Sequence, residues 1–89
     1  YPNPFSPIEG TTIRYILNKP ADVSIYVYDI SGDLVGRVIE NQRRETGTNK
    51  ERWDGKSVYG QTLPNGVYLC EIVIDDETKK YIKIVVYEK

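Results

Sequence analysis

The sequence contains no histidine and no methionine, and it has only one cysteine, one tryptophan and one phenylalanine among its 89 residues. Without histidine, Ser-His-Asp and Cys-His catalysis, histidine zinc sites and the usual acid or base of neutral pH are excluded. The single cysteine, Cys70, cannot form a disulfide within the chain, which leaves the redox compartment open. Most catalytic mechanisms are therefore excluded, and we expect neither enzyme activity nor a cofactor.

Long apolar segments and an excess of one charge are also missing. No uncharged apolar stretch is longer than the four residues from Ile84 to Tyr87, which is far too short to cross a membrane. The 12 Lys+Arg and 13 Asp+Glu are scattered along the chain, so they form no basic stripe that could neutralise phosphates. We expect a soluble, monomeric domain that neither binds nucleic acid nor inserts into a membrane.

The length allows one compact domain and no second lobe. A folded chain of this size should have a radius of gyration of roughly 12 Å and bury about 60% of its unfolded surface. Residues 1–89 are therefore treated as one domain, in which the proline-rich segment 1–10 forms an extended lead-in. The absence of methionine and the bulky Tyr1 indicate a fragment of a longer protein, so an upstream domain is an expected partner.

Polar and apolar residues alternate over most of the chain, and Gly, Pro, Asn and Asp separate the alternating segments. This period of two predicts β-strands. The predicted strands span residues 12–17, 23–29, 34–39, 50–53, 67–74 and 80–87. A helical turn over 38–43 is the weaker alternative because Gly36 interrupts that segment. We predict an all-β fold, a small antiparallel β-sandwich of six to seven strands in which Trp53 is a buried anchor.

The carboxylates are candidates for general acid and base catalysis or for calcium binding. Glu71 with Asp54, or with one of Asp75 and Asp76, would be the strongest catalytic pair. However, Asp54 and Asp75 occupy turns, where an aspartate accepts local backbone hydrogen bonds. Neither acidic cluster, at 29–33 or at 75–77, matches a calcium-binding loop. We therefore assign no catalytic, cofactor or metal residues. Cys70 alternates with apolar residues and is interpreted as a buried, inert thiol.

Tyrosine is in excess, with eight residues, and four of them suggest a surface patch. Tyr26 and Tyr28 share one face of their strand, and Tyr81 and Tyr87 share one face of the last strand, in both cases opposite the apolar face. If those strands adjoin, the rings could stack against sugar rings or a protein partner. The plainer alternative is that tyrosine simply suits half-exposed strands.

Five short motifs occur in order over nearly the whole chain. They are Pro2-Asn3-Pro4-Phe5, Thr11-Thr12-Ile13-Arg14-Tyr15, Val27-Tyr28-Asp29 with Gly32 and Leu34-Val35, Trp53-Asp54-Gly55, and Gly60 followed by Leu63-Pro64-Asn65-Gly66-Val67-Tyr68. Together they resemble the C-terminal sorting domain of proteins exported by the type IX secretion system, which is similar to the immunoglobulin-like domain of the flagellar hook-capping protein. Cys70 departs from the pattern, since that family more often has an aromatic or aliphatic residue there.

The resemblance implies an immunoglobulin-like β-sandwich at the end of large secreted or cell-surface proteins, where export machinery or cell-surface components recognise it. The residues that correspond to the family's recognised features are Pro2, Asn3, Pro4, Gly66, Tyr68, Lys80, Lys83 and Lys89. The leading hypothesis is thus a non-catalytic sorting or anchoring module. The alternatives are an accessory module that binds polysaccharide or protein, and a structural domain like that of the hook cap.

Overall fold

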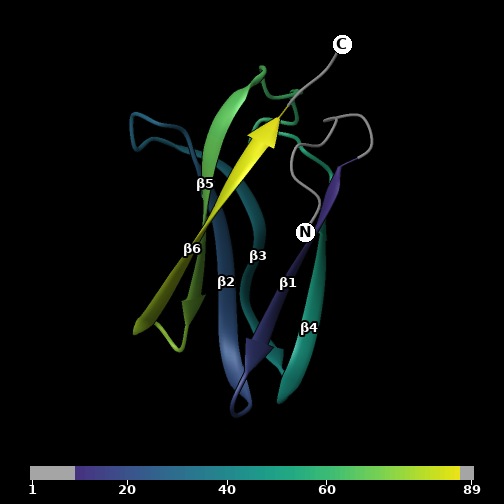
Figure 1. Ribbon diagram of the computed structural model, residues 1–89, viewed down its shortest axis with the longest axis vertical. Helices are drawn as coiled ribbons and strands as arrows, with labels where there is room; N and C mark the ends of the chain where they lie inside the picture. The colour runs from purple at the N-terminus through teal and green to yellow at the C-terminus, as the bar shows by residue number, and fades with distance from the viewer. Residues whose placement is uncertain (1–9, 87–89) are drawn as a thin grey trace.

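The computed structural model describes residues 10–86, which form an all-β sandwich of two antiparallel sheets. Four strands form one sheet in the order β3-β2-β5-β6, and two strands form the second sheet, β1-β4 (Figure 1). The strands are β1 (Thr11–Leu17), β2 (Ala21–Tyr28), β3 (Leu34–Arg44), β4 (Gly47–Trp53), β5 (Gly66–Ile74) and β6 (Thr78–Val86). The predicted fold class and the predicted alternation of strands and turns are confirmed.

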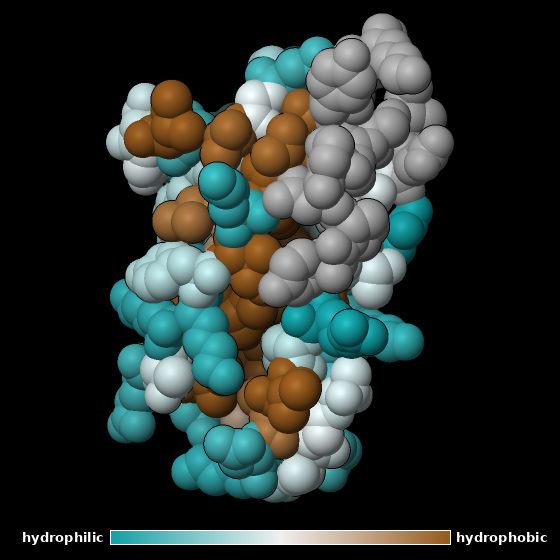
Figure 2. Space-filling view, viewed as in Figure 1, coloured by the Kyte–Doolittle hydropathy of each residue, from teal (hydrophilic) through white to brown (hydrophobic). Residues whose placement is uncertain are grey.

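The core lies between the two sheets and is built largely from alternate residues of the strands, although β3 contributes only partly buried side chains. Val23, Ile25 and Val27 of β2 are fully buried, and Cys70 and Ile72 of β5 lie beside them. Successive side chains of a strand point to opposite faces, so the intervening residues of β2 and β5 face away from the core. A column of hydrophobic atoms is visible between β6 and β1 (Figure 2).

The third strand is longer than predicted, since it continues from Ile39 to Arg44. The pairing of β2 with β3 shifts register three times, and Asn41 has a φ of 49°. The Asn41 amide donates a hydrogen bond to Ser24 Oγ at 2.9 Å, so this irregularity leaves no unsatisfied donor there. Because a β-bulge inserts an extra residue, it breaks the alternation of two on which the prediction depended. The fourth strand likewise begins earlier than predicted, at Gly47, and the sixth begins at Thr78.

Trp53 joins the two sheets and is 2% exposed, as predicted. It lies at the end of β4, and its ring covers Gly36 of β3. A Cβ atom at Gly36 would lie 3.3 Å from Trp53 Cζ2 and 3.4 Å from Val27 Cβ. Glycine at this position therefore lets the indole approach the backbone of the larger sheet.

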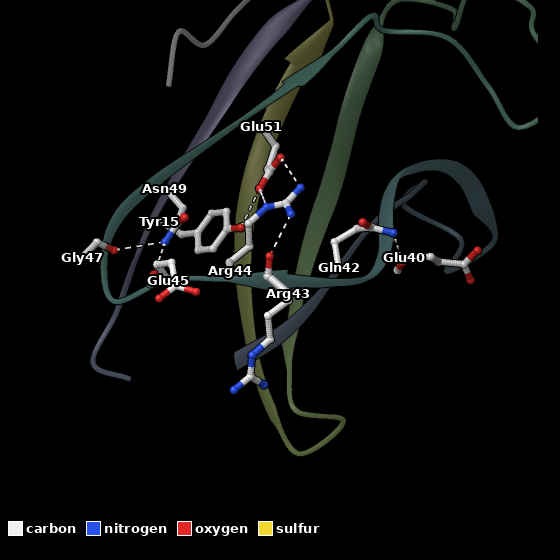
Figure 3. A network of polar contacts seen from close by, with 9 residues as sticks. All are labelled: Tyr15, Glu40, Gln42, Arg43, Arg44, Glu45, Gly47, Asn49 and Glu51. Carbon is white, nitrogen blue, oxygen red and sulfur yellow. Dashed lines mark hydrogen bonds and ion pairs between the residues drawn. The ribbon is translucent and has the colours of Figure 1, made fainter. Parts of the chain in front are cut away.

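A buried polar network also connects the sheets, through β1, β4 and β3 (Figure 3). Tyr15 donates its hydroxyl proton to Glu51 Oε2 at 2.7 Å, and Arg44 donates through Nε at 2.7 Å and through a terminal nitrogen at 3.2 Å. Burial alone would raise the pKa of Glu51, but the hydrogen bonds from Arg44 and Tyr15 and the charge of Arg44 outweigh it, so the pKa is lowered. The charge of Glu51 is thus stabilised inside the fold.

Cys70 is predicted to be chemically silent in the folded chain. Its side chain is fully buried, and burial, with a smaller contribution from the charge of Glu71, raises the pKa of the thiol from 9.0 to about 12. The thiolate is the reactive form, so this rise lowers the reactive fraction about a thousand-fold. The measurement uses a disulfide reagent that reacts with thiols and releases a light-absorbing product. We expect it to label the native chain negligibly and the guanidinium-unfolded chain completely. Rapid labelling of the native chain would contradict the burial.

Candidate functional site

The outward face of the four-stranded sheet carries three of the four tyrosines that the sequence singled out. Tyr26 and Tyr28 are on β2, and Tyr81 is on β6, which does not adjoin β2 because β5 lies between them. The patch is therefore not the continuous two-strand platform considered from the sequence. Tyr87 lies outside the described residues.

Glu71 of β5 brings two of these tyrosines together. Tyr28 donates its hydroxyl proton to Glu71 Oε1 at 3.3 Å, and Tyr81 donates to Oε2 at 2.9 Å. Glu71 pairs directly with Tyr81 across β5 and β6, and Tyr28 reaches it diagonally from β2. Glu71 as a residue is only 9% exposed although it is on the outward face of the sheet. Tyr26 is separate, since it donates to Glu40 at 3.0 Å.

An open groove of about 520 Å³ lies beside this cluster. Tyr28, Glu71 and Tyr81 line one part of it. Val67 and Leu69, the preceding outward residues of β5, line another part, and Lys83 of β6 also contributes. The groove continues towards the β2–β3 loop, where Ile30 is 85% exposed. Hydrophobic atoms gather at the upper left of the molecule, over this loop and the adjoining ends of the sheet (Figure 2).

The β2–β3 loop that forms the wall of the groove is held by its own hydrogen bonds. Asp29 Oδ1 accepts bonds from the backbone amides of Ser31 at 2.9 Å and Asp33 at 3.0 Å, and the Asp29 amide donates to the Asp33 carbonyl at 3.0 Å. Gly32 has a φ of 89°, which glycine adopts without steric cost. The loop thus places Ile30 in a defined position at the groove.

Electrostatics keep the two phenols of the cluster protonated. Burial, followed by the charge and hydrogen bond of Glu71, raises the pKa of Tyr28. The hydrogen bond to Glu71 is the main cause that raises the pKa of Tyr81. Both hydroxyl groups therefore remain proton donors to Glu71 at neutral pH.

The residues assigned from the family resemblance occupy different environments. Lys80 and Lys83 are exposed on β6, which is an edge strand of the four-stranded sheet. Tyr68 is buried and donates its hydroxyl proton to the Pro64 carbonyl at 2.7 Å, so it fixes the loop before β5. Gly66 begins β5 and does not have the positive φ that would require glycine. Pro2, Asn3, Pro4 and Lys89 lie outside the described residues.

Asp54 and Asp75, which the sequence analysis considered as catalytic partners of Glu71, have structural roles. Asp54 Oδ1 accepts a local bond from the Lys56 amide at 2.9 Å, as a turn aspartate should. Asp75 differs from the expectation of a purely local bond, because its Oδ1 accepts from the Asp22 amide at 2.9 Å and so ties the β5–β6 turn to β2. Among residues 10–86 there is no group of three His, Cys, Asp or Glu residues that could hold a metal ion.

Sequence reasoning did not find the Tyr28–Glu71–Tyr81 cluster, although one signal was present. Glu71 has the same parity as Val67 and Leu69, and the opposite parity to Cys70, which was interpreted as buried. What the sequence does not supply is the order of the strands, which sets β5 between the two tyrosine strands.

No helix long and apolar enough to cross a membrane occurs within the described part of the chain.

Comparison with solved structures identifies the same fold in several bacterial proteins. PorZ, an essential bacterial surface component of the type-IX secretion system of Porphyromonas gingivalis, is 25% identical over 99% of this chain with a TM-score of 0.67. Dimeric latent PorU from Porphyromonas gingivalis is 24% identical over 100% of this chain with a TM-score of 0.76. FLGD from P. aeruginosa is 23% identical over 94% of this chain with a TM-score of 0.68.

The chain spans only 11% of the PorZ chain, 9% of the PorU chain and 66% of the FLGD chain. No curated protein sequence matches it significantly. Residues 5–77, however, match the FlgD Ig-like domain family. This match covers most of the chain, and together with the structural neighbours it confirms the resemblance inferred from the motifs. The chain therefore belongs to the FlgD Ig-like domain family.

Proposed function

We propose that this chain is a non-catalytic sorting or anchoring module of a secreted or cell-surface protein, recognised by the type IX export machinery. The observation that carries the proposal is the likeness to PorZ over 99% of the chain at 25% identity, since PorZ is a surface component of that system. The family match is compatible with this function and equally with a structural domain like that of FLGD.

The described surface offers one region suited to recognition of a folded domain. Lys79, Lys80 and Lys83 are exposed on β6, at the edge of the larger sheet. An exporter that carries folded cargo must read a feature that is accessible in the folded state. The side chains of an edge strand meet this requirement, and clustered lysines also discourage edge-to-edge association with other chains.

The experiment fuses the intact domain to the C-terminus of a reporter that carries a signal peptide, in a host with a type IX system. A variant with Lys80, Lys83 and Lys89 changed to glutamine is compared with the unaltered fusion. We expect the reporter to reach the cell surface only with the unaltered domain, because the substitutions remove the positive charges of Lys80 and Lys83 on β6 and of Lys89, which follows β6 in the sequence.

The matched control changes Arg14, Lys50 and Lys56 to glutamine, since these three basic residues are exposed and lie outside the four-stranded sheet that contains β6. Each surface substitution should alter the free energy of unfolding by no more than about 0.5 kcal/mol. Lost export with an unchanged melting temperature would then mean lost recognition. Export that survives the substitutions of Lys80, Lys83 and Lys89, or that falls equally with the control set, would contradict a role for these lysines in recognition.

A further inference from the structure

The groove on the outward sheet face contains a carboxylate whose environment is unusual. Glu71 is 9% exposed, and none of the ion pairs among residues 10–86 includes it; those pairs are Arg37–Glu40, Arg43–Asp22 and Arg44–Glu51. Burial of a charge is costly unless the charge is paired. Glu51, the other acidic residue buried to this degree, has Arg44 as its cation. Glu71 has instead two neutral phenols.

The polar atoms around Glu71 are arranged to accept hydrogen bonds. Each tyrosine hydroxyl has one proton, and the hydroxyls of Tyr28 and Tyr81 donate theirs to Glu71. Their oxygen lone pairs, and the remaining lone pairs of the carboxylate, are therefore available only to a donor. A ligand that fits here must bring N–H or O–H groups.

The charge and the lining of the groove restrict the chemical class of the ligand further. Of the charged residues that line the groove, Glu71 and Asp29 are negative and Lys83 is positive, which gives a net charge of minus one. The tyrosine rings can hold a cation over their faces, and a guanidinium group stacks well on such rings. Beyond them the lining is aliphatic, from Leu69 and Val67 to Ile30. Sugar hydroxyl groups accept hydrogen bonds as well as donate them, so a sugar also needs donors from the protein. The acceptor atoms around Glu71 therefore suit a sugar less well than a cation.

We propose that the groove binds a peptide segment of a partner protein, with an arginine side chain placed on Glu71 between Tyr28 and Tyr81 and a neighbouring apolar side chain against Leu69, Val67 and Ile30. The guanidinium supplies the cation that Glu71 lacks. The groove includes Lys83, one of the β6 lysines to which we assign sorting, but the test of peptide binding requires no export machinery.

The test titrates the isotope-labelled 89-residue chain with two peptides, acetyl-Leu-Arg-Leu-amide and acetyl-Leu-Gln-Leu-amide, and follows backbone amide shifts by NMR. Charge-assisted hydrogen bonds are roughly twice as strong as neutral ones, so the arginine peptide should bind at least about ten-fold more tightly. The shifts should map to Tyr28, Leu69, Glu71 and Tyr81. In Glu71→Gln the preference for arginine should disappear.

The matched control is Glu40→Gln, because Glu40 also accepts a bond from a tyrosine of this sheet but does not line the groove. It should keep the preference for arginine. Equal affinity for the two peptides, or shifts that lie outside the groove, would overturn the proposal; this comparison uses the unaltered chain, so it holds even if Glu71→Gln unfolds. Binding of soluble cellohexaose at the groove without binding of either peptide would also overturn it, in favour of a carbohydrate site.

Discussion

Replacement of Trp53 by alanine is expected to destabilise the domain by about 3–5 kcal/mol, the usual cost of truncating a fully buried aromatic side chain. Trp53 is 2% exposed and lies against Gly36 of the opposite sheet, so its removal leaves a cavity at the point where the two sheets meet. A domain of this size has a small total stability, and a loss of this size can unfold a large fraction of the molecules. Urea unfolding followed by circular dichroism measures the loss.

The control for this substitution is Tyr59→Ala, since Tyr59 is an aromatic residue of the following loop that is 86% exposed. It should change the free energy of unfolding by no more than about 0.5 kcal/mol. Trp53 is the single tryptophan of the chain, so its fluorescence reports its environment directly. Native emission typical of an indole in water would contradict the burial. A loss of unfolding free energy in Trp53→Ala below about 1 kcal/mol, roughly one third of the smallest expected value, would also contradict it.

Replacement of Glu51 by glutamine is expected to cost about 2 kcal/mol at neutral pH. The substitution removes the charge that accepts two bonds from Arg44 and one from Tyr15, while it keeps the size of the side chain. Removing one partner of a buried charged group leaves the other partners poorly satisfied. Because the Arg44 side chain is 29% exposed, water relieves part of the loss, and we expect less than the full cost of breaking a deeply buried pair.

This effect should depend on pH with a definite sign. The pKa of Glu51 is lowered in the folded chain from its ordinary value of 4.5, so its contribution to stability is fully present above pH 4.5 and is lost as the pH falls through the folded pKa. The difference in unfolding free energy between the unaltered chain and Glu51→Gln should therefore shrink below pH 4.5. Glu40→Gln, at an exposed carboxylate that also accepts a tyrosine bond, should show only a small difference at either pH. A Glu51→Gln difference that stays constant into acid would contradict the network.

The fold was largely predictable because its strands follow the alternation of polar and apolar residues. The buried faces Val23-Ile25-Val27 and Cys70-Ile72 were visible in the sequence, as were the hairpin loops. The end of β3 was not, because bulges and the positive φ of Asn41 interrupt the alternation from which strands are recognised.

The candidate site was only partly predictable for a different reason. Which side chains face outward follows from parity within one strand, and on that basis Tyr28 and Tyr81 were placed opposite the apolar faces of their strands. Which of them meet depends on the order of the strands, and that order is set by long-range packing. The same reason hid the network of Tyr15, Arg44 and Glu51, whose members come from three strands.

The most direct test of the proposed function is the location of the reporter fused to the intact domain, in the type IX-competent host and in the same host without the exporter. Surface location in the first strain and periplasmic retention in the second is the predicted result, with a folded domain verified in both. Retention of the folded fusion in the periplasm of the competent strain would contradict the sorting function and leave a structural or binding role for this domain.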